Sequence, residues 1–93
     1  MGITAKDVPF LPRGVRLHEC KVRKGWFLLA PERALKMDQI GAAILRAVDG
    51  ERSLEAMIGK LAEDFQAPVA QIRGDVERFL EDLRLKRMVE LRS

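Results

Sequence analysis

The sequence predicts an α+β fold in which a three-stranded antiparallel sheet is followed by a three-helix bundle. Residues 14–37 hold short apolar stretches that alternate with charged residues or end at tight turns, which is typical of strands. Residues 38–86 repeat apolar residues every three or four positions, which is typical of helices. A chain of 93 residues, 47% of them hydrophobic, can form one domain with a modest core but no deep enclosed active site.

The N-terminal residues 1–13 are expected to form an arm that lies over the domain. Pro9 and Pro12 interrupt regular structure in this stretch. The first strand is expected within residues 14–22, where apolar and polar residues alternate as on a half-buried strand. The sheet is therefore predicted to begin only after the arm.

Two further strands complete the predicted sheet. The polar residues 23–25 predict a tight turn, and the apolar run at 26–30 suits a central strand. Pro31 ends that run, since proline has no N–H to donate to a neighbouring strand. The chain then returns as a third strand at Arg33–Met37. This strand is expected at an edge of the sheet, because no further obvious strand follows to cover it.

The first two helices have recognisable ends. Asp38 is predicted to cap a helix over residues 39–48, which Asp49 and Gly50 terminate because glycine readily adopts the left-handed conformation of helix ends. Ser53 is the N-cap candidate of the second helix. The apolar residues at helical spacing are Ile40, Ala43, Ile44, Ala47 and Val48 in the first helix, and Leu54, Met57, Ile58, Leu61, Ala62 and Phe65 in the second.

A third helix is expected from Pro68 to about Leu85, and a tail of residues 87–93 can pack back on the sheet as a short extended segment. The apolar residues of this helix form two adjacent stripes. One stripe could serve the core while the other lines a groove opposite the edge strand, or both could form one wide core face. The stripes are Ile72, Val76, Phe79 and Leu83, and Val69, Val76 and Leu80.

Charge and cysteine content narrow the class of protein. The formal charge is +3, and residues 1–30 carry six basic and two acidic side chains. This bias favours an acidic peptide or protein surface as partner, with a solvated basic face as the alternative. Cys20 is the single cysteine, so no internal disulfide or thiol metal cluster is expected, and a cytoplasmic location fits. We find no apolar run long enough to span a membrane.

Signals for catalysis or cofactor binding are weak. His18 and Cys20 lie two residues apart on a predicted strand, hence on one face, but no orienting group or oxyanion site accompanies them. Two such residues are too few for a metal site. The glycines are dispersed and form no phosphate-binding signature. We therefore expect a protein that is not an enzyme and that has no cofactor.

Two binding functions remain. Three strands and three helices are the inventory of a winged helix-turn-helix in altered order, so a DNA-binding regulator is the alternative. The third helix, however, carries four acidic and three basic residues over 73–84, which would repel the DNA backbone. An edge strand beside an apolar helix stripe instead suits strand addition, in which an extended peptide pairs with the edge and places side chains in the groove.

The chain also resembles the pyrroloquinoline quinone (PQQ) biosynthesis protein D family over about residues 9–91. The resemblance rests on five segments in this order and spacing. They are GVRL at 14–17, GWFLLAPE at 25–32, LKMDQIGAAILRAVDG at 35–50, SLEAMIGKL at 53–61 and DVERFLEDL at 75–83.

This resemblance implies a peptide chaperone, the recognition element for a ribosomally made and modified peptide, with a winged-helix-like fold. It implies that the chain binds the PQQ precursor peptide and presents it to a radical S-adenosylmethionine (SAM) enzyme that joins a glutamate to a tyrosine. The peptide would lie antiparallel to the third strand, against the third helix. The implied binding residues are Arg33, Ala34, Leu35, Lys36 and Met37 of the strand, and Val69, Arg73, Val76, Glu77 and Leu80 of the helix.

Two points about the chain's ends and assembly complete these expectations. Family members often carry a glycine after the final helix, where this chain has Arg87, so a differently shaped helix end is expected. The exposed edge and the short connection near Pro31 would allow either a monomer or a homodimer formed by strand exchange.

Overall fold

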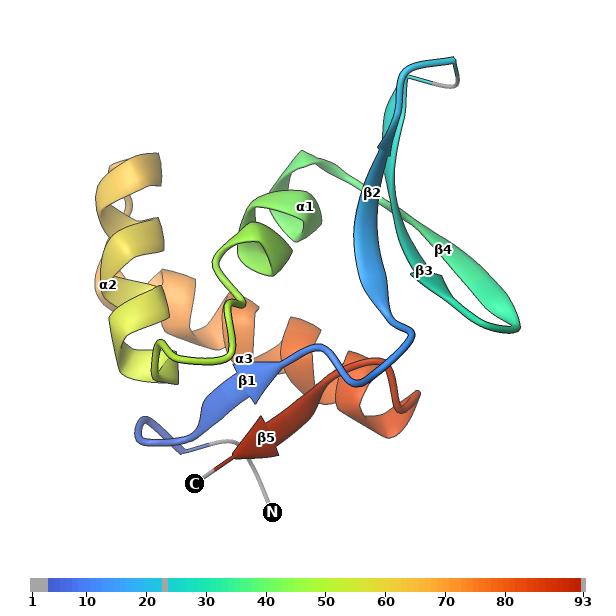
Figure 1. The fold of residues 1–93 in the computed structure, drawn as a ribbon. Coiled ribbons are helices and arrows are strands. Elements are labelled where there is room, and N and C mark those ends of the chain that lie inside the picture. Colours follow the sequence, from blue (N-terminus) through green and yellow to red (C-terminus); the bar gives the residue numbers. More distant parts are fainter. Residues whose placement is uncertain (1–3, 23, 93) are drawn as a thin grey trace.

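The computed structural model describes residues 4–22 and 24–92 of the chain (Figure 1). The elements follow one another as β1 (Val8–Phe10), β2 (Arg16–Cys20), β3 (Gly25–Ala30), β4 (Arg33–Met37), α1 (Gln39–Arg46), α2 (Leu54–Phe65), α3 (Val69–Leu85) and β5 (Glu90–Arg92). The α+β class predicted from the sequence is confirmed. None of the helices within the described ranges is both long and apolar enough to cross a membrane.

The central three strands form an antiparallel sheet in the order β2-β3-β4, as predicted. A two-residue turn at Pro31 and Glu32 joins β3 to β4, so that Ala30 lies opposite Arg33. The third strand has the predicted bounds, Arg33–Met37. The predicted turn at residues 23–25 includes Arg23, which lies outside the described residues.

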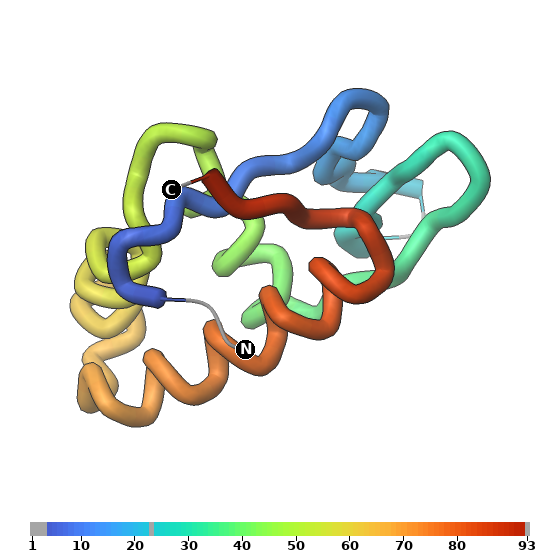
Figure 2. The backbone as a smooth tube through the Cα atoms, turned by 90° about the horizontal axis from the view of Figure 1, so that it is seen from below, coloured from blue at the N-terminus to red at the C-terminus, as the bar shows by residue number. Residues whose placement is uncertain are grey.

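A second, two-stranded sheet joins the two ends of the chain. β1 pairs antiparallel with β5, with Pro9 opposite Leu91, and Figure 2 shows these two segments side by side. The prediction of an arm without regular structure is therefore wrong for Val8–Phe10, and residues 1–3 of the predicted arm lie outside the described residues. A proline fits this strand because β1 has a single described strand neighbour, so the missing N–H need not face a partner.

The N-terminal residues also contribute to the start of α2. The carbonyl groups of Ala5 and Asp7 accept hydrogen bonds from the backbone N–H groups of Glu55 (3.0 Å) and Leu54 (2.8 Å). Ser53 caps the same helix as predicted, with its hydroxyl accepting from Ala56 N at 3.2 Å. The first-turn N–H groups of α2, which have no partner within the helix, are thus satisfied from two directions.

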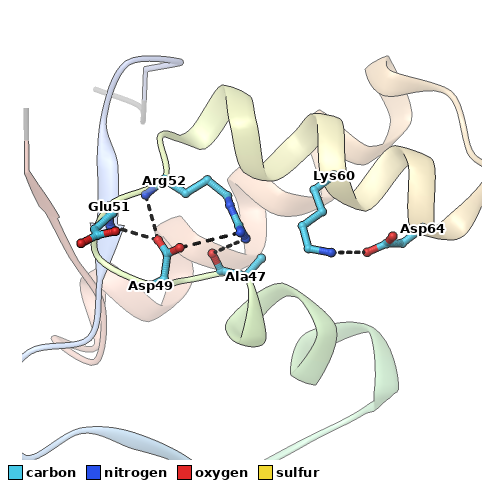
Figure 3. A network of polar contacts seen from close by, with 6 residues as sticks. All are labelled: Ala47, Asp49, Glu51, Arg52, Lys60 and Asp64. Carbon is cyan, nitrogen blue, oxygen red and sulfur yellow. Dashed lines mark hydrogen bonds and ion pairs between the residues drawn. The ribbon is translucent and has the colours of Figure 1, made fainter.

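Helix α1 begins as predicted but ends early. The Asp38 carboxylate accepts a 2.6 Å hydrogen bond from Gly41 N. The helix ends at Arg46, whereas the sequence predicted a helix to residue 48. The Asp49 carboxylate accepts from the N–H groups of Glu51 (3.0 Å) and Arg52 (2.8 Å), so it organises the loop between helices instead of ending one (Figure 3).

The core lies between the three helices and one face of the β2-β3-β4 sheet. Its members include Leu28 of β3, Leu45 of α1 and Leu80 of α3, each at most 2% exposed. Two predicted inner-face residues are not in it. Ile40 is 57% exposed and Phe65 is 44% exposed, because Ile40 lies in the first turn of α1 and Phe65 is the last residue of α2, beyond the buried part of each helix.

Helix α3 ends in a compact backbone motif. Arg87 has a φ of +62°, the N–H of Met88 donates to the Leu83 carbonyl at 2.9 Å, and the N–H of Arg87 donates to the Arg84 carbonyl at 3.0 Å. This is the Schellman arrangement, in which the residue after the cap is left-handed. The helix end therefore has the shape that a glycine would favour, and the expectation of a different shape at Arg87 is wrong.

Candidate functional site

The free side of β4 is an open edge of the β2-β3-β4 sheet. Among the described strands, β4 pairs only with β3. Antiparallel residues alternate between hydrogen-bonded and non-hydrogen-bonded pairs, and a two-residue turn closes on a hydrogen-bonded pair, here Ala30 and Arg33. The backbone N–H and C=O groups of Ala34 and Lys36 therefore point away from β3. They are available to an added strand.

The opposite edge, β2, is also open, but helix α3 distinguishes the two edges. Gly41 lies in the first turn of α1, three residues after the N-cap Asp38. A Cβ atom added at Gly41 would lie 3.1 Å from Phe79 Cε1. The Phe79 ring of α3 thus packs where β4 passes into α1. Only a small residue fits at position 41, so this glycine permits the close approach of α3 to the end of β4.

The side chains of β4 alternate between the core and solvent. Leu35 lies opposite the buried Leu28 and packs against the core while remaining half-buried, and Met37 is 9% exposed. Ala34, Lys36 and Arg33 are exposed. The strand therefore presents two basic side chains and part of one leucine beside its free backbone groups.

Helix α3 contributes differently from the sequence-based expectation. Val76 and Leu80 are 1% and 0% exposed, so they support the site from the core. Arg73 and Glu77 are half-buried but lie about 120° and 160° around the helix from Phe79, on the side away from β4. Val69 is 50% exposed and lies about 15 Å along the helix axis from Phe79.

The structure thus places Phe79 against Gly41 in the first turn of α1, directly after β4, and it does not bring Val69, Arg73 or Glu77 to the same place. Phe79 belongs to the first of the two predicted apolar stripes, together with Ile72. Both residues are half-buried. The sequence does contain one indication of this contact. The segment DQIG directly after the strand places a glycine in the first turn of the helix, where the missing side chain leaves room for an aromatic ring.

The polar groups near this edge are held by local ion pairs. Asp82 pairs with Lys86 at 3.0 Å and Asp75 with Arg78 at 2.8 Å. On the other flank of α3, the guanidinium of Arg84 donates to Glu81 and lowers the pKa of that carboxyl group. These pairs occupy three of the four acidic side chains of α3, namely Asp75, Glu81 and Asp82. The charges on the strand are Arg33 and Lys36.

In the described residues, no group of metal-ligating side chains lies near the β4 edge. Within residues 4–22 and 24–92, no three histidine, cysteine or carboxylate side chains are placed to hold a metal ion. His18 is exposed and Cys20 half-buried on β2, at the far edge of the sheet. The arrangement around β4 can supply main-chain hydrogen bonds, apolar contact and positive charge.

The fold and this site define a winged-helix-like α+β domain with an open strand edge beside a helix. A sequence profile described as Coenzyme PQQ synthesis protein D (PqqD) matches residues 25–89. A PqqA binding protein of Rhizobium meliloti (strain 1021) is 48% identical over 89 residues, covering 96% of this chain and 91% of the relative. One of Xanthomonas axonopodis pv. citri (strain 306) is 41% identical over 90 residues, covering 97% and 98%. The chain belongs to the PqqD family.

Solved structures agree with this assignment. The solution structure of the PqqD part of Methylobacterium extorquens PqqCD, described as a functional, stand-alone recognition element for ribosomally synthesised and modified peptides, has a TM-score of 0.82 and 39% identity. It covers 95% of this chain, and 94% of its own length is matched. The crystal structure of PqqD from Xanthomonas campestris has a TM-score of 0.58 and 37% identity, with coverages of 84% and 87%.

Proposed function

We propose that this chain binds the PqqA precursor peptide by strand addition to β4. The observation that carries the proposal is the open β4 edge beside Phe79, in a chain whose relatives are named PqqA binding proteins. An added strand forms main-chain hydrogen bonds with Ala34 and Lys36, and its inward side chains contact Leu35 and Phe79. Arg33 and Lys36 favour acidic residues in the paired segment.

In this proposal the chain acts as an adaptor and catalyses no reaction itself. We assign the chain the task of presenting the bound peptide, in the cytoplasm, to a radical SAM enzyme that joins a glutamate to a tyrosine of the peptide. Strand addition suits this task because it fixes the backbone of a flexible peptide while leaving residues outside the paired segment free to enter an active site.

A proline placed on each edge of the sheet tests the site. Ala34→Pro removes a free N–H of β4 and puts a ring where an added strand would lie, without removing a β3–β4 hydrogen bond. We expect the Kd for PqqA to rise about tenfold or more, since a lost hydrogen bond of about 1.4 kcal/mol corresponds to a factor of ten. Titration calorimetry with the PqqA peptide measures this change.

The matched control is Glu19→Pro, which makes the same change at an exposed, outward-directed position of the other edge strand, β2. Circular dichroism must show both variants folded, and Lys36→Pro provides a second β4 variant. Equal affinity of the Ala34→Pro, Lys36→Pro and Glu19→Pro proteins for PqqA would contradict the β4 site. Failure of the unaltered chain to bind PqqA would contradict the function.

The alternative of a DNA-binding regulator makes an opposite prediction. It requires binding to duplex DNA that weakens steeply as salt is added. Gel-shift titration at low salt distinguishes the two, and tight DNA binding without PqqA binding would favour the regulator.

The free edge also bears on assembly. We propose that the chain is a monomer in equilibrium with a homodimer in which strands are exchanged, because an unpaired edge can pair with a second copy. Light scattering over a dilution series should give a mass that falls towards that of one chain. PqqA should favour the monomer, since it competes for β4, and a mass that is constant on dilution would contradict the exchange.

A further inference from the structure

A small apolar pocket lies where the start of α1, the end of α2 and the first half of α3 meet. Its volume is about 170 Å³. Apolar side chains form most of the wall, while Gln71 and Asp75 of α3 also line it. The large apolar side chains of the wall are Ile40, Ile44, Leu61, Phe65, Ile72 and Val76, and Ala67 completes it.

Exposed apolar side chains gather around this pocket. Ile40 and Phe65 in its wall are 57% and 44% exposed, and Val69, one helical turn before Ile72, is 50% exposed. These are three of the five large hydrophobic side chains that are exposed in the described part of the chain. Such clustering on a small domain marks a binding surface, whereas isolated exposed hydrophobic residues need no explanation.

The pocket lies close to the end of β4. Ile40 follows Met37 by three residues, so their Cα atoms are at most about 11 Å apart. On α3, Ile72 precedes Phe79 by seven residues and lies on the same flank, about 10 Å along the axis. The helix therefore runs alongside the path from the end of β4 to the pocket, and Figure 2 shows α3 beside the start of α1.

We propose that this pocket binds one large apolar side chain of the same peptide that pairs with β4. The inference rests on the proposed function and adds an anchor to it. An extended chain advances about 3.3 Å per residue, so the anchor lies roughly three or four residues beyond the one opposite Met37. Leucine, isoleucine, methionine and phenylalanine have the required chemistry, since the wall offers chiefly apolar contact.

A peptide residue fits the pocket better than a folded partner for two reasons. The volume is that of one side chain, and a wall residue of the pocket, Ile40, is within about 11 Å of the end of the strand edge on which we propose an extended chain. A second binding point also compensates for the entropy that a flexible peptide loses when it is fixed on β4, because both contacts share one ordering cost. The anchor thereby sets which stretch of a peptide aligns with β4.

Variants of the exposed wall test the anchor without removing core residues. Ile40→Ser and Phe65→Ser should each raise the Kd for PqqA about tenfold, the loss expected when an apolar contact of one side chain is truncated. Val22→Ser is the matched control, since Val22 is 92% exposed at the hairpin tip and does not line the pocket. Its Kd should equal that of the unaltered chain in calorimetric titration.

Alanine substitutions at the large apolar residues of PqqA complete the experiment as a double-mutant cycle. At one peptide position the alanine effect should be large with the unaltered chain and absent with Ile40→Ser. If PqqA binds, Ala34→Pro weakens binding, and Ile40→Ser and Phe65→Ser both match Val22→Ser, the anchor is refuted while the β4 site stands. Loss of association with the radical SAM enzyme, at unchanged peptide affinity, would likewise overturn it.

Discussion

Replacing Arg87 with glycine should raise the free energy of unfolding, because position 87 holds a left-handed backbone at the end of α3. Its φ of +62° brings the Cβ of an L-residue close to the backbone. The conformation is imposed by the two hydrogen bonds that close the helix end and by the burial of Met88 and Leu83, which are 1% and 2% exposed. Glycine can adopt it without a steric penalty.

The expected gain follows from two opposing contributions. A left-handed L-residue costs about 1–2 kcal/mol, and glycine loses about 0.5–1 kcal/mol more backbone entropy on folding. The difference predicts that the free energy of unfolding rises by about 0.5–1 kcal/mol for Arg87→Gly, equivalent to a Tm increase of about 2–8 °C in a domain of this size.

Urea unfolding followed by far-ultraviolet circular dichroism measures this change. Lys86→Gly is the control, since the neighbouring residue has a φ of −85° and gains nothing from glycine. This variant should lose about 0.5–1 kcal/mol. If Arg87→Gly loses as much stability as Lys86→Gly, the left-handed strain is not present, and the account of the helix end is wrong.

Two further stability predictions follow. Leu80→Ala should lower the free energy of unfolding, measured in urea, by about 2–5 kcal/mol because Leu80 is 0% exposed. The control Leu85→Ala should change this free energy by less than about 0.5 kcal/mol, since Leu85 is 73% exposed. Similar losses in the two variants would contradict the burial of Leu80. Hydrogen bonds from the N–H groups of Arg52 and Glu51 lower the pKa of Asp49 below 3.8. The free energy of unfolding of Asp49→Asn should therefore be lower than that of the unaltered chain above that pH. The difference between the two proteins should close as the pH falls through the lowered pKa. A difference that does not depend on pH in urea unfolding would contradict this account.

The third strand and the helix caps could be predicted because their causes are local. Pro31 and the turn after it fix where β4 begins, and Asp38 bonds a backbone group three residues away. The α1 end was missed for a related reason, since Asp49 can either end a helix or hold a loop. The N–H of Arg52, in the connection before α2, donates to that carboxylate, and this contact selects the loop.

The candidate site divides in the same way. The strand half of the site, Arg33–Met37, follows from the order of short apolar runs along the chain. The helix half requires the rotation of α3 about its axis, which the packing of Val76, Leu80 and Leu83 into the core determines. That rotation places Phe79 against Gly41, just after β4, and turns Arg73 and Glu77 away from this place.

The sequence by itself therefore determined the α+β class, the edge strand and the capped starts of α1 and α2, since each depends on residues a few positions apart. Only the tertiary structure decided that β1 pairs with β5, because Val8 and Arg92 meet from opposite ends of the chain. It also decided that Ile40 and Phe65 face solvent around a pocket. An apolar stripe on a helix indicates that its burial is favourable. Which of its residues are in fact buried depends on how the three helices pack together.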